Sequence, residues 1–191
     1  MKDTKQIIIH TTMNLFRKIG YEKTTIAEIC KACNITKGTF YYYFESKDDI
    51  CIAYHEMIQD QIDTILPELL MMDDPREQLW KVMEYGIHNS MALGPKLLKA
   101  FFLSEMQKGL QQFGVYNLRT IDSSSNEMNA LSLAKSFVIK GQALGKIKPG
   151  NPENMIYTFH SACMAMAFDW ASNDGTFDEQ NEMKKYFDVI F

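Results

Sequence analysis

Long hydrophobic runs are missing from this chain of 191 residues. A membrane-spanning helix needs about 20 consecutive apolar residues. Charges interrupt even the most apolar stretch, Met91 to Met106, at Lys96, Lys99 and Glu105. Only four cysteines are present, too few for the disulfide framework of a secreted domain. Because the amino terminus also lacks the apolar core of a secretory signal, we expect a cytoplasmic protein with no membrane partner.

The usual signatures of catalysis and of resident metals are also missing. The chain has no glycine-rich phosphate loop, no His-Glu-x-x-His and no Gly-x-Ser-x-Gly. Glu84 stands four residues before His88 rather than the three that a di-iron helical site requires. We therefore expect neither an enzyme nor a protein that holds a metal or a cofactor.

The charge that is present is unevenly distributed. Residues 1–47 carry eight basic and four acidic residues, whereas the remainder carries twelve basic and twenty acidic residues. Only the first segment, with a net charge of +4, suits a polyanion. Any binding to nucleic acid should be confined to it and should weaken with salt. Short segments vary in charge, so charge alone leaves such binding an open question.

Apolar residues recur at three- and four-residue steps along most of the chain, which predicts an all-α protein. The first helix is expected from about Thr4 to Ile19, with Gly20 as its left-handed stop. Next, Thr25-Ile26-Ala27-Glu28 forms a capping box that begins a short helix ending near Cys33.

A second short helix is expected from Lys37, after Asn34 in a left-handed turn and Thr36 as the cap. Phe40 and Phe44 would then share one face, while polar and tyrosine side chains occupy the other. This arrangement is a helix-turn-helix, whose last helix can enter the DNA major groove. The run Phe-Tyr-Tyr-Tyr-Phe is rich in β-forming residues, so a strand is the alternative.

One long helix and five later helices are expected after this segment. Ser46 to Asp49 repeat the capping pattern and begin a long helix that Pro67 closes near Leu66. We expect this helix to transmit changes between the two ends of the molecule. The later helices are expected at about 75–92, 95–113, 127–144, 152–171 and 178–190, with a polar loop at 122–126.

The stretch from Thr24 to Lys47, preceded by Phe16 and Gly20-Tyr21, resembles the DNA-binding segment of TetR-family (tetracycline-repressor-like) transcriptional regulators. The resemblance covers the first quarter of the chain, and the rest agrees in length and helical character. It implies a helix-turn-helix DNA-binding domain at 1–47 and a helical ligand-binding and dimerisation domain at 48–191. It also implies a homodimeric repressor that a small apolar or amphipathic ligand releases from a palindromic double-stranded operator.

The resemblance also assigns the DNA contacts by position. Lys47→Ala is expected to weaken binding to all sequences and to flatten the salt dependence by about one unit, as a lost phosphate contact would. Cys30 and Cys33 replace common alanines of the family, and Asn34 replaces its turn glycine. The expected DNA-binding residues are Thr25, Thr36, Lys37, Gly38, Thr39, Tyr41, Tyr42 and Lys47.

Cys30 and Cys33 form a Cys-x-x-Cys motif, which in other contexts is half of a zinc site or a redox pair. No second such motif exists, and His10 is the one histidine of the segment. We therefore expect both thiols to pack as small apolar groups, with a redox role as the alternative.

The second domain is rich in methionine and aromatic residues, which line apolar ligand cavities as well as cores. Candidate ligand-binding residues are Trp80, Met83, His88, Phe102, Phe137, His160 and Met164. Candidate dimerisation residues, which would otherwise be intramolecular core, are Met155, Phe159, Cys163, Met166, Trp170, Tyr186, Phe187 and Ile190. The rival function is a helical ligand-binding or scaffolding protein without DNA activity.

Overall fold

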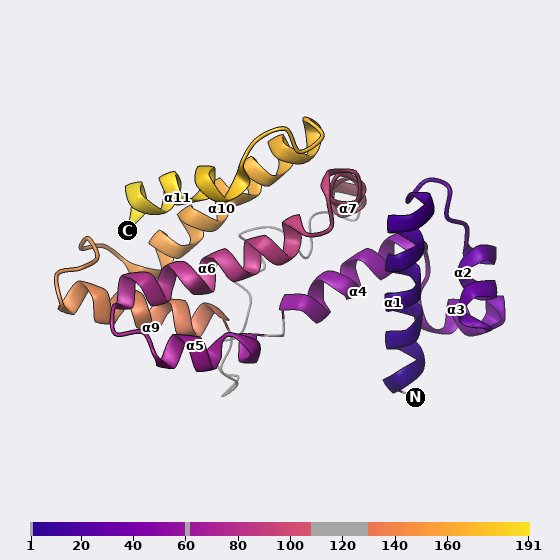
Figure 1. Ribbon diagram of the computed structural model, residues 1–191, viewed down its shortest axis with the longest axis horizontal. Coiled ribbons are helices and arrows are strands. Elements are labelled where there is room, and N and C mark those ends of the chain that lie inside the picture. The colour runs from indigo at the N-terminus through magenta and orange to yellow at the C-terminus, as the bar shows by residue number, and fades with distance from the viewer. Residues whose placement is uncertain (1, 60–61, 108–129) are drawn as a thin grey trace.

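The computed structural model describes residues 2–59, 62–107 and 130–191, and every regular element in these ranges is helical (Figure 1). The expected all-α fold is therefore confirmed. The elements are α1 (Lys2–Ile19), α2 (Ile26–Cys33), α3 (Lys37–Tyr43), α4 (Lys47–Gln59), a 3-10 turn (Ile62–Thr64), α5 (Leu66–Leu70), α6 (Pro75–Met91), α7 (Pro95–Gln107), α9 (Ala130–Ala143), α10 (Pro152–Ser172) and α11 (Glu179–Ile190).

The first helix boundaries follow local backbone chemistry. Gly20 ends α1 with a φ of 90°, and Asn34 ends α2 with a φ of 54°, both in the left-handed region. Thr25 and Glu28 form the complete capping box at the start of α2. Thr36 caps α3 by accepting a hydrogen bond from the backbone N–H of Thr39 at 3.0 Å. These four expectations are confirmed.

The strand alternative for the aromatic run is excluded, because residues 37–43 are α3. The β propensity of three consecutive tyrosines is overridden by tertiary packing. Phe40 is completely buried and Phe44 nearly so, with their ring centroids 6.1 Å apart. A strand would place Tyr42 on the same face as Phe40 and Phe44, whereas the helix buries the two phenylalanines and leaves Tyr42 70% exposed.

The expectation that α4 reaches Leu66 and is closed by Pro67 is wrong. Helix α4 ends at Gln59, and residues 62–64 form a 3-10 turn. Pro67 lies in the first turn of α5, where its missing N–H costs nothing because that group has no partner within a helix. The proline thus belongs to the start of a helix rather than to the end of one.

The later boundaries agree with expectation where they are described. Helices α6, α10 and α11 begin and end within one residue of the expected limits. The ends expected near 113 and 127, and the polar loop at 122–126, lie outside the described residues. None of the helices in the described ranges combines the length and apolar character needed to cross a bilayer.

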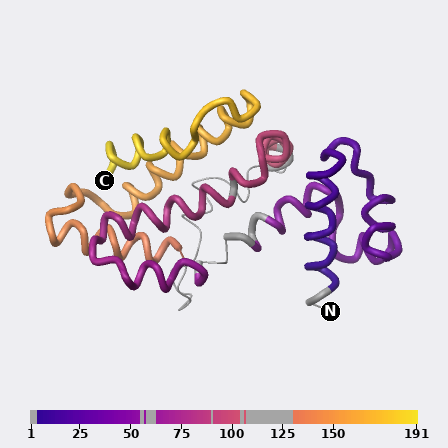
Figure 2. Tube along the Cα trace, viewed as in Figure 1, coloured from indigo at the N-terminus to yellow at the C-terminus, as the bar shows by residue number. Residues whose placement is uncertain are grey.

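Helices α1 to α3, here called the N-terminal unit, lie at one end of the molecule, and α9 to α11 with the carboxy terminus lie at the other (Figures 1 and 2). In the larger part, which comprises α5 to α11, α6 packs on α9, and α10 packs on α11 and α7. Helix α4 contacts α1 on one side and both α6 and α7 on the other. It is therefore the element that connects the two parts.

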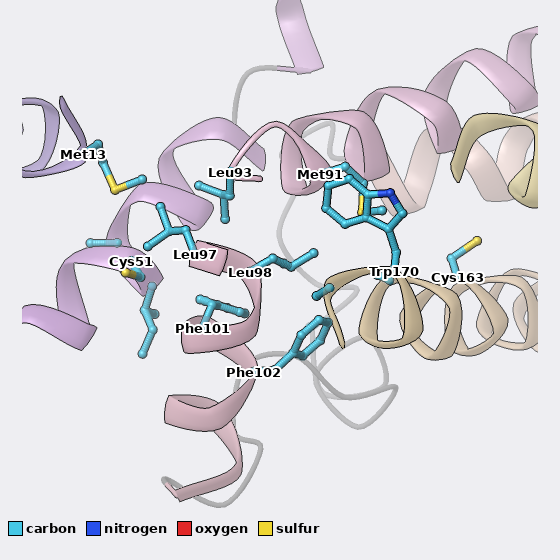
Figure 3. Close-up of a cluster of buried hydrophobic side chains, with 14 of the residues drawn as sticks. Met13, Cys51, Met91, Leu93, Leu97, Leu98, Phe101, Phe102, Cys163 and Trp170 are labelled. Atoms are coloured by element: carbon cyan, nitrogen blue, oxygen red, sulfur yellow. The ribbon is translucent and has the colours of Figure 1, made fainter. Parts of the chain in front are cut away.

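The hydrophobic core continues from the N-terminal unit into the larger part through α4 and α7 (Figure 3). Met13 of α1 and Cys51 of α4 are buried at one end of this cluster. Leu97 and Phe101 of α7 follow, and Trp170 and Cys163 of α10 lie towards the other end. Because packed interiors transmit displacements, a shift of α7 should be felt by α4.

Candidate nucleic-acid interface

The turn between α2 and α3 is closed by the backbone itself. The N–H of Ile35 donates to the carbonyl of Cys30 at 3.0 Å, and the N–H of Asn34 donates to the carbonyl of Lys31 at 3.3 Å. Asn34 in the left-handed conformation makes both bonds possible. The two helices thus form a helix-turn-helix with a defined angle between them.

One face of α3 anchors the helix, and the other faces solvent. Phe40 and Phe44 are buried on the inner face, and α3 packs against α2. On the outer face, Tyr41 is 54% and Tyr42 70% exposed, and Lys37 and Gly38 are exposed as well. Exposed tyrosine rings beside a lysine offer hydroxyl and ammonium donors together with stacking surface, as nucleic-acid interfaces use.

Thr36 and Thr39 are linked at the start of α3. Their hydroxyl oxygens lie 2.9 Å apart, in addition to the capping bond. Thr39 is half-buried and Thr36 is exposed. The structure thus brings together six of the expected DNA-binding residues on or beside one short helix: Thr36, Lys37, Gly38, Thr39, Tyr41 and Tyr42.

Thr25 lies apart, at the exposed start of α2. Its hydroxyl and its N–H both meet the carboxylate of Glu28, at 3.0 and 2.7 Å. These hydrogen bonds lower the pKa of Glu28, the one from the backbone N–H most, so the carboxylate stays ionised at neutral pH. A phosphate approaching Thr25 would therefore meet a negative charge.

Lys47 has partners within its own chain. Its Nζ donates to the carbonyl of Tyr21 at 2.8 Å and to that of Thr24 at 3.3 Å. The ammonium also lies 4.1 Å from the centroid of the Tyr21 ring. Lys47 and Lys37 are thus in different situations, because Lys37 is exposed on the outer face of α3. Sequence reasoning missed this, since only the fold brings residues 26 positions apart together.

Cys30 is buried and Cys33 half-buried, and both are free thiols. Burial raises the pKa of Cys33, which disfavours the reactive thiolate. Within the described ranges, no group of three or more His, Cys, Asp or Glu side chains is arranged to hold a metal ion. The thiols lie in the packing of α2 rather than at its outer surface.

Replacing both Cys30 and Cys33 by alanine should therefore lower the free energy of unfolding only modestly, by about 1–2 kcal/mol, because little volume is lost. DNA binding should be unchanged. Urea denaturation and a duplex-binding titration of the double variant would measure both effects. Stoichiometric zinc in the wild-type protein that the variant loses would contradict the packing role.

The candidate ligand-binding residues do not gather at one point. The ring of Trp80 lies 5.1 Å from that of Phe187, which in turn contacts Phe159 of α10. The ring of Phe102 lies 5.7 Å from that of Phe168. Phe168 follows Phe159 by nine residues along α10. At 1.5 Å per residue, the two sites are about 13 Å apart along that helix.

The remaining candidates differ in burial. His88 is exposed, whereas Met83, Phe137 and Met164 are partly buried. Burial lowers the pKa of His160, so its imidazole is neutral at neutral pH. Its Nδ1 is buried with no hydrogen-bond partner recorded for it in the described part of the chain. His160 is therefore the candidate that offers a buried ring nitrogen for a hydrogen bond to a ligand in the larger part.

Most candidate dimerisation residues are intramolecular core. Five of the eight are buried within the protomer: Phe159, Cys163, Met166, Trp170 and Phe187. The outer face of α10 instead presents Thr158, Ser161, Ala165 and the 48% exposed Phe168. These four residues recur at three- and four-residue steps and so form one stripe.

Comparisons with known proteins agree with this geometry. Residues 8–54 match the family described as bacterial regulatory proteins, tetR family. The uncharacterized HTH-type transcriptional regulator YhgD of Bacillus subtilis is 24% identical over 183 residues, which cover 93% of this chain and 90% of that protein.

Two solved structures share the fold over nearly the whole chain. The first is FadR of Thermus thermophilus, a TetR-family repressor in complex with lauroyl-CoA, with 21% identity and a TM-score of 0.66 over 97% of this chain and 92% of that one. The second is FadR of Bacillus subtilis in complex with stearoyl-CoA, with 18% identity and a TM-score of 0.57 over 97% and 96%. Residues 8–54 thus match the DNA-binding segment of the tetR family, and the chain is a DNA-binding transcriptional regulator with the fold of TetR-family repressors.

Proposed function

We propose that the protein is a homodimeric repressor whose two α3 helices bind the half-sites of a palindromic operator. The observation that carries this proposal is the two-sided α3, with Phe40 and Phe44 buried and Lys37, Tyr41 and Tyr42 exposed. The division into a DNA-binding domain at 1–47 and a ligand-binding and dimerisation domain at 48–191 belongs to the same proposal. The place of action is the cytoplasm, where bacterial operators are accessible.

Different residues of α3 have different tasks in this proposal. Lys37 and Thr36 contact phosphates, which positions the helix without reading sequence. Thr39 and Tyr42 reach base edges in the major groove, where each base pair presents a distinct pattern of donors and acceptors. Gly38 lets the backbone approach the duplex closely. Thr25 is the weakest of the proposed contacts because of the adjacent Glu28 carboxylate.

The dimer brings two N-terminal units to half-sites about one helical turn apart. The outer stripe of α10, with Ser161, Ala165 and Phe168, is the proposed contact surface, because the small Ser161 and Ala165 permit close approach of a second helix and Phe168 offers exposed apolar surface. In this proposal the buried aromatic residues of α10, Phe159 and Trp170, support the stripe from within the protomer and do not contact the second protomer.

Binding to duplex DNA can be tested by selecting bound fragments from genomic DNA and titrating the selected operator. Lys37→Ala should flatten the slope of log affinity against log salt by about one unit, as the loss of one phosphate contact does. Tyr42→Ala should change sequence preference. Lys140→Ala, an exposed lysine of α9, is the matched control and should leave the slope unchanged.

If the protein preferred no genomic fragment at low salt, the proposed repressor function would be rejected. The rival, a helical ligand-binding or scaffolding protein without DNA activity, would then stand.

The proposed effector is an apolar or amphipathic small molecule that binds the second domain. The lauroyl-CoA and stearoyl-CoA complexes of the two FadR proteins support a long acyl chain as the first class to test. A ligand can release DNA only if it binds the DNA-incompetent arrangement more tightly than the competent one. The proposed route is the shared core of α7 and α4 (Figure 3), since α7 contacts both α10 and α4.

Isothermal titration of lauroyl-CoA with and without the selected operator tests this route. Coupling is reciprocal, so operator DNA should weaken ligand binding by the same factor by which ligand weakens DNA binding, typically about 5- to 150-fold. Resorcinol, a small aromatic compound, serves as the comparison ligand. Equal affinities in the presence and absence of operator would reject the inducer role of the compound tested.

A further inference from the structure

Lys47 is the first residue of α4, yet its ammonium is used at the connection between α1 and α2. The Nζ donates to the carbonyls of Tyr21 and Thr24, at 2.8 and 3.3 Å, and lies 4.1 Å from the centroid of the Tyr21 ring. Asp48, the next residue, accepts a hydrogen bond from the hydroxyl of Tyr21. We call these contacts of Lys47 and Asp48 with residues 21 and 24 the Tyr21 clamp.

The charge of Lys47 is unfavourably placed unless these contacts compensate for it. The amino terminus of a helix carries a partial positive charge, which disfavours a cation there. Asp48 and Asp49 in the same first turn suit that end of the helix, whereas Lys47 does not. Two carbonyl oxygens and the negative face of an aromatic ring supply the compensation.

The clamp is attached to the core of the N-terminal unit. The Tyr21 ring lies 5.0 Å from the ring of Phe16, which is buried in α1. Further along α4, the hydroxyl of Tyr54 accepts a hydrogen bond from the guanidinium of Arg17 of α1 at 3.1 Å. These two polar links, about two turns of α4 apart, fix the direction in which α4 leaves the N-terminal unit.

That direction matters for a dimer that must span two half-sites. The 13 residues of α4 extend about 20 Å at 1.5 Å per residue. A rotation of about 10° at one end therefore moves the other end by roughly 3.5 Å, close to the ~3.4 Å step of one base pair. Loosening the clamp should thus blur the spacing between the two α3 helices.

We propose that Lys47 is a positioning residue that sets this spacing through the Tyr21 clamp, and that it is not a phosphate contact. The proposal rests on the proposed DNA-binding function and deepens it. It replaces the role that the family resemblance implies for Lys47 with one that follows from its hydrogen bonds. The phosphate-contacting lysine in this region is Lys37, which is exposed on α3.

The test uses Lys47→Met, which keeps most of the aliphatic side chain, and Lys37→Ala as the matched control. Their salt slopes are measured on a 30-base-pair duplex of random sequence, where only phosphate contacts count. Lys47→Met should leave the slope unchanged, whereas Lys37→Ala should reduce it by about one unit. Thermal unfolding by circular dichroism is recorded for each variant.

The second measurement uses the selected operator and two versions whose centre is longer or shorter by one base pair. The wild type should discriminate against the altered spacings, and Lys47→Met should reduce that discrimination at least threefold. Tyr21→Leu should do the same although it keeps the lysine. Lys47→Arg should restore the discrimination, because a guanidinium can also donate to two carbonyls and stack on the ring. A variant that is merely less stable would bind all three spacings more weakly by one common factor.

Three results would overturn the positioning role while leaving the repressor intact: a slope reduced by about one in Lys47→Met, an unchanged spacing preference in that variant, or full discrimination in Tyr21→Leu. If Lys47→Met does not fold, Tyr21→Leu still decides between the two roles, because it removes the ring contacts of the clamp and keeps the cation. Failure of the wild-type protein to bind either kind of duplex would overturn the proposed function and the positioning role together.

Discussion

Phe40→Ala should unfold α3 and abolish specific DNA binding. Phe40 is completely buried, and truncation of a buried phenylalanine to alanine costs about 3–5 kcal/mol. Helix α3 has only seven residues and is far too short to be stable without tertiary packing. Removing its central anchor should therefore displace Lys37 and Tyr42 together, although neither is mutated.

Urea denaturation followed by circular dichroism measures the stability of the Phe40→Ala variant, and titration of the selected operator measures its DNA binding. Tyr41→Ala is the matched control, since this neighbouring ring is 54% exposed and should change stability by less than about 1 kcal/mol. Equal losses of stability in the two variants would contradict the burial that the fold assigns to Phe40.

Phe187→Ala is expected to have a comparable effect on the second part of the molecule. Its ring lies among those of Trp80, Phe159 and Phe191, with centroid distances of 5.1, 5.8 and 4.9 Å. Arg76 also lies over it, with the guanidinium 5.0 Å from the ring centroid. The change thus removes the main aromatic contacts of α11 with α6 and α10, at a cost of about 3–5 kcal/mol.

Val189→Ala, two residues away on α11 and 74% exposed, is the control for Phe187→Ala. It should change the free energy of unfolding by less than about 0.5 kcal/mol. Sedimentation velocity of both variants shows whether the proposed dimer is lost along with the packing of α11. A Phe187 variant as stable as the Val189 variant would show that α11 is not held by this aromatic cluster.

Several local elements were predictable because their causes lie within a few residues. The capping pair of Thr25 and Glu28, the left-handed Asn34 and the Thr36 cap all act between neighbours in the chain. The error at Pro67 has an equally local origin. A proline is compatible both with the residue after a helix and with the first turn of the next one, so pattern alone cannot distinguish these positions.

The all-helical class and the caps around the turn between α2 and α3 were thus predictable from the sequence, because capping and three- to four-residue periodicity are short-range properties. The helical state of residues 37–43 depended on tertiary packing, because burial of Phe40 and Phe44 overrides the β propensity of the tyrosines. The tertiary structure alone decided which of two lysines is exposed. Lys37 and Lys47 have identical chemistry, and only folding brings Tyr21 and Thr24 to one of them. It likewise decided that Phe187 belongs to the interior, because a helix with apolar residues on one face does not itself specify the surface that will cover it.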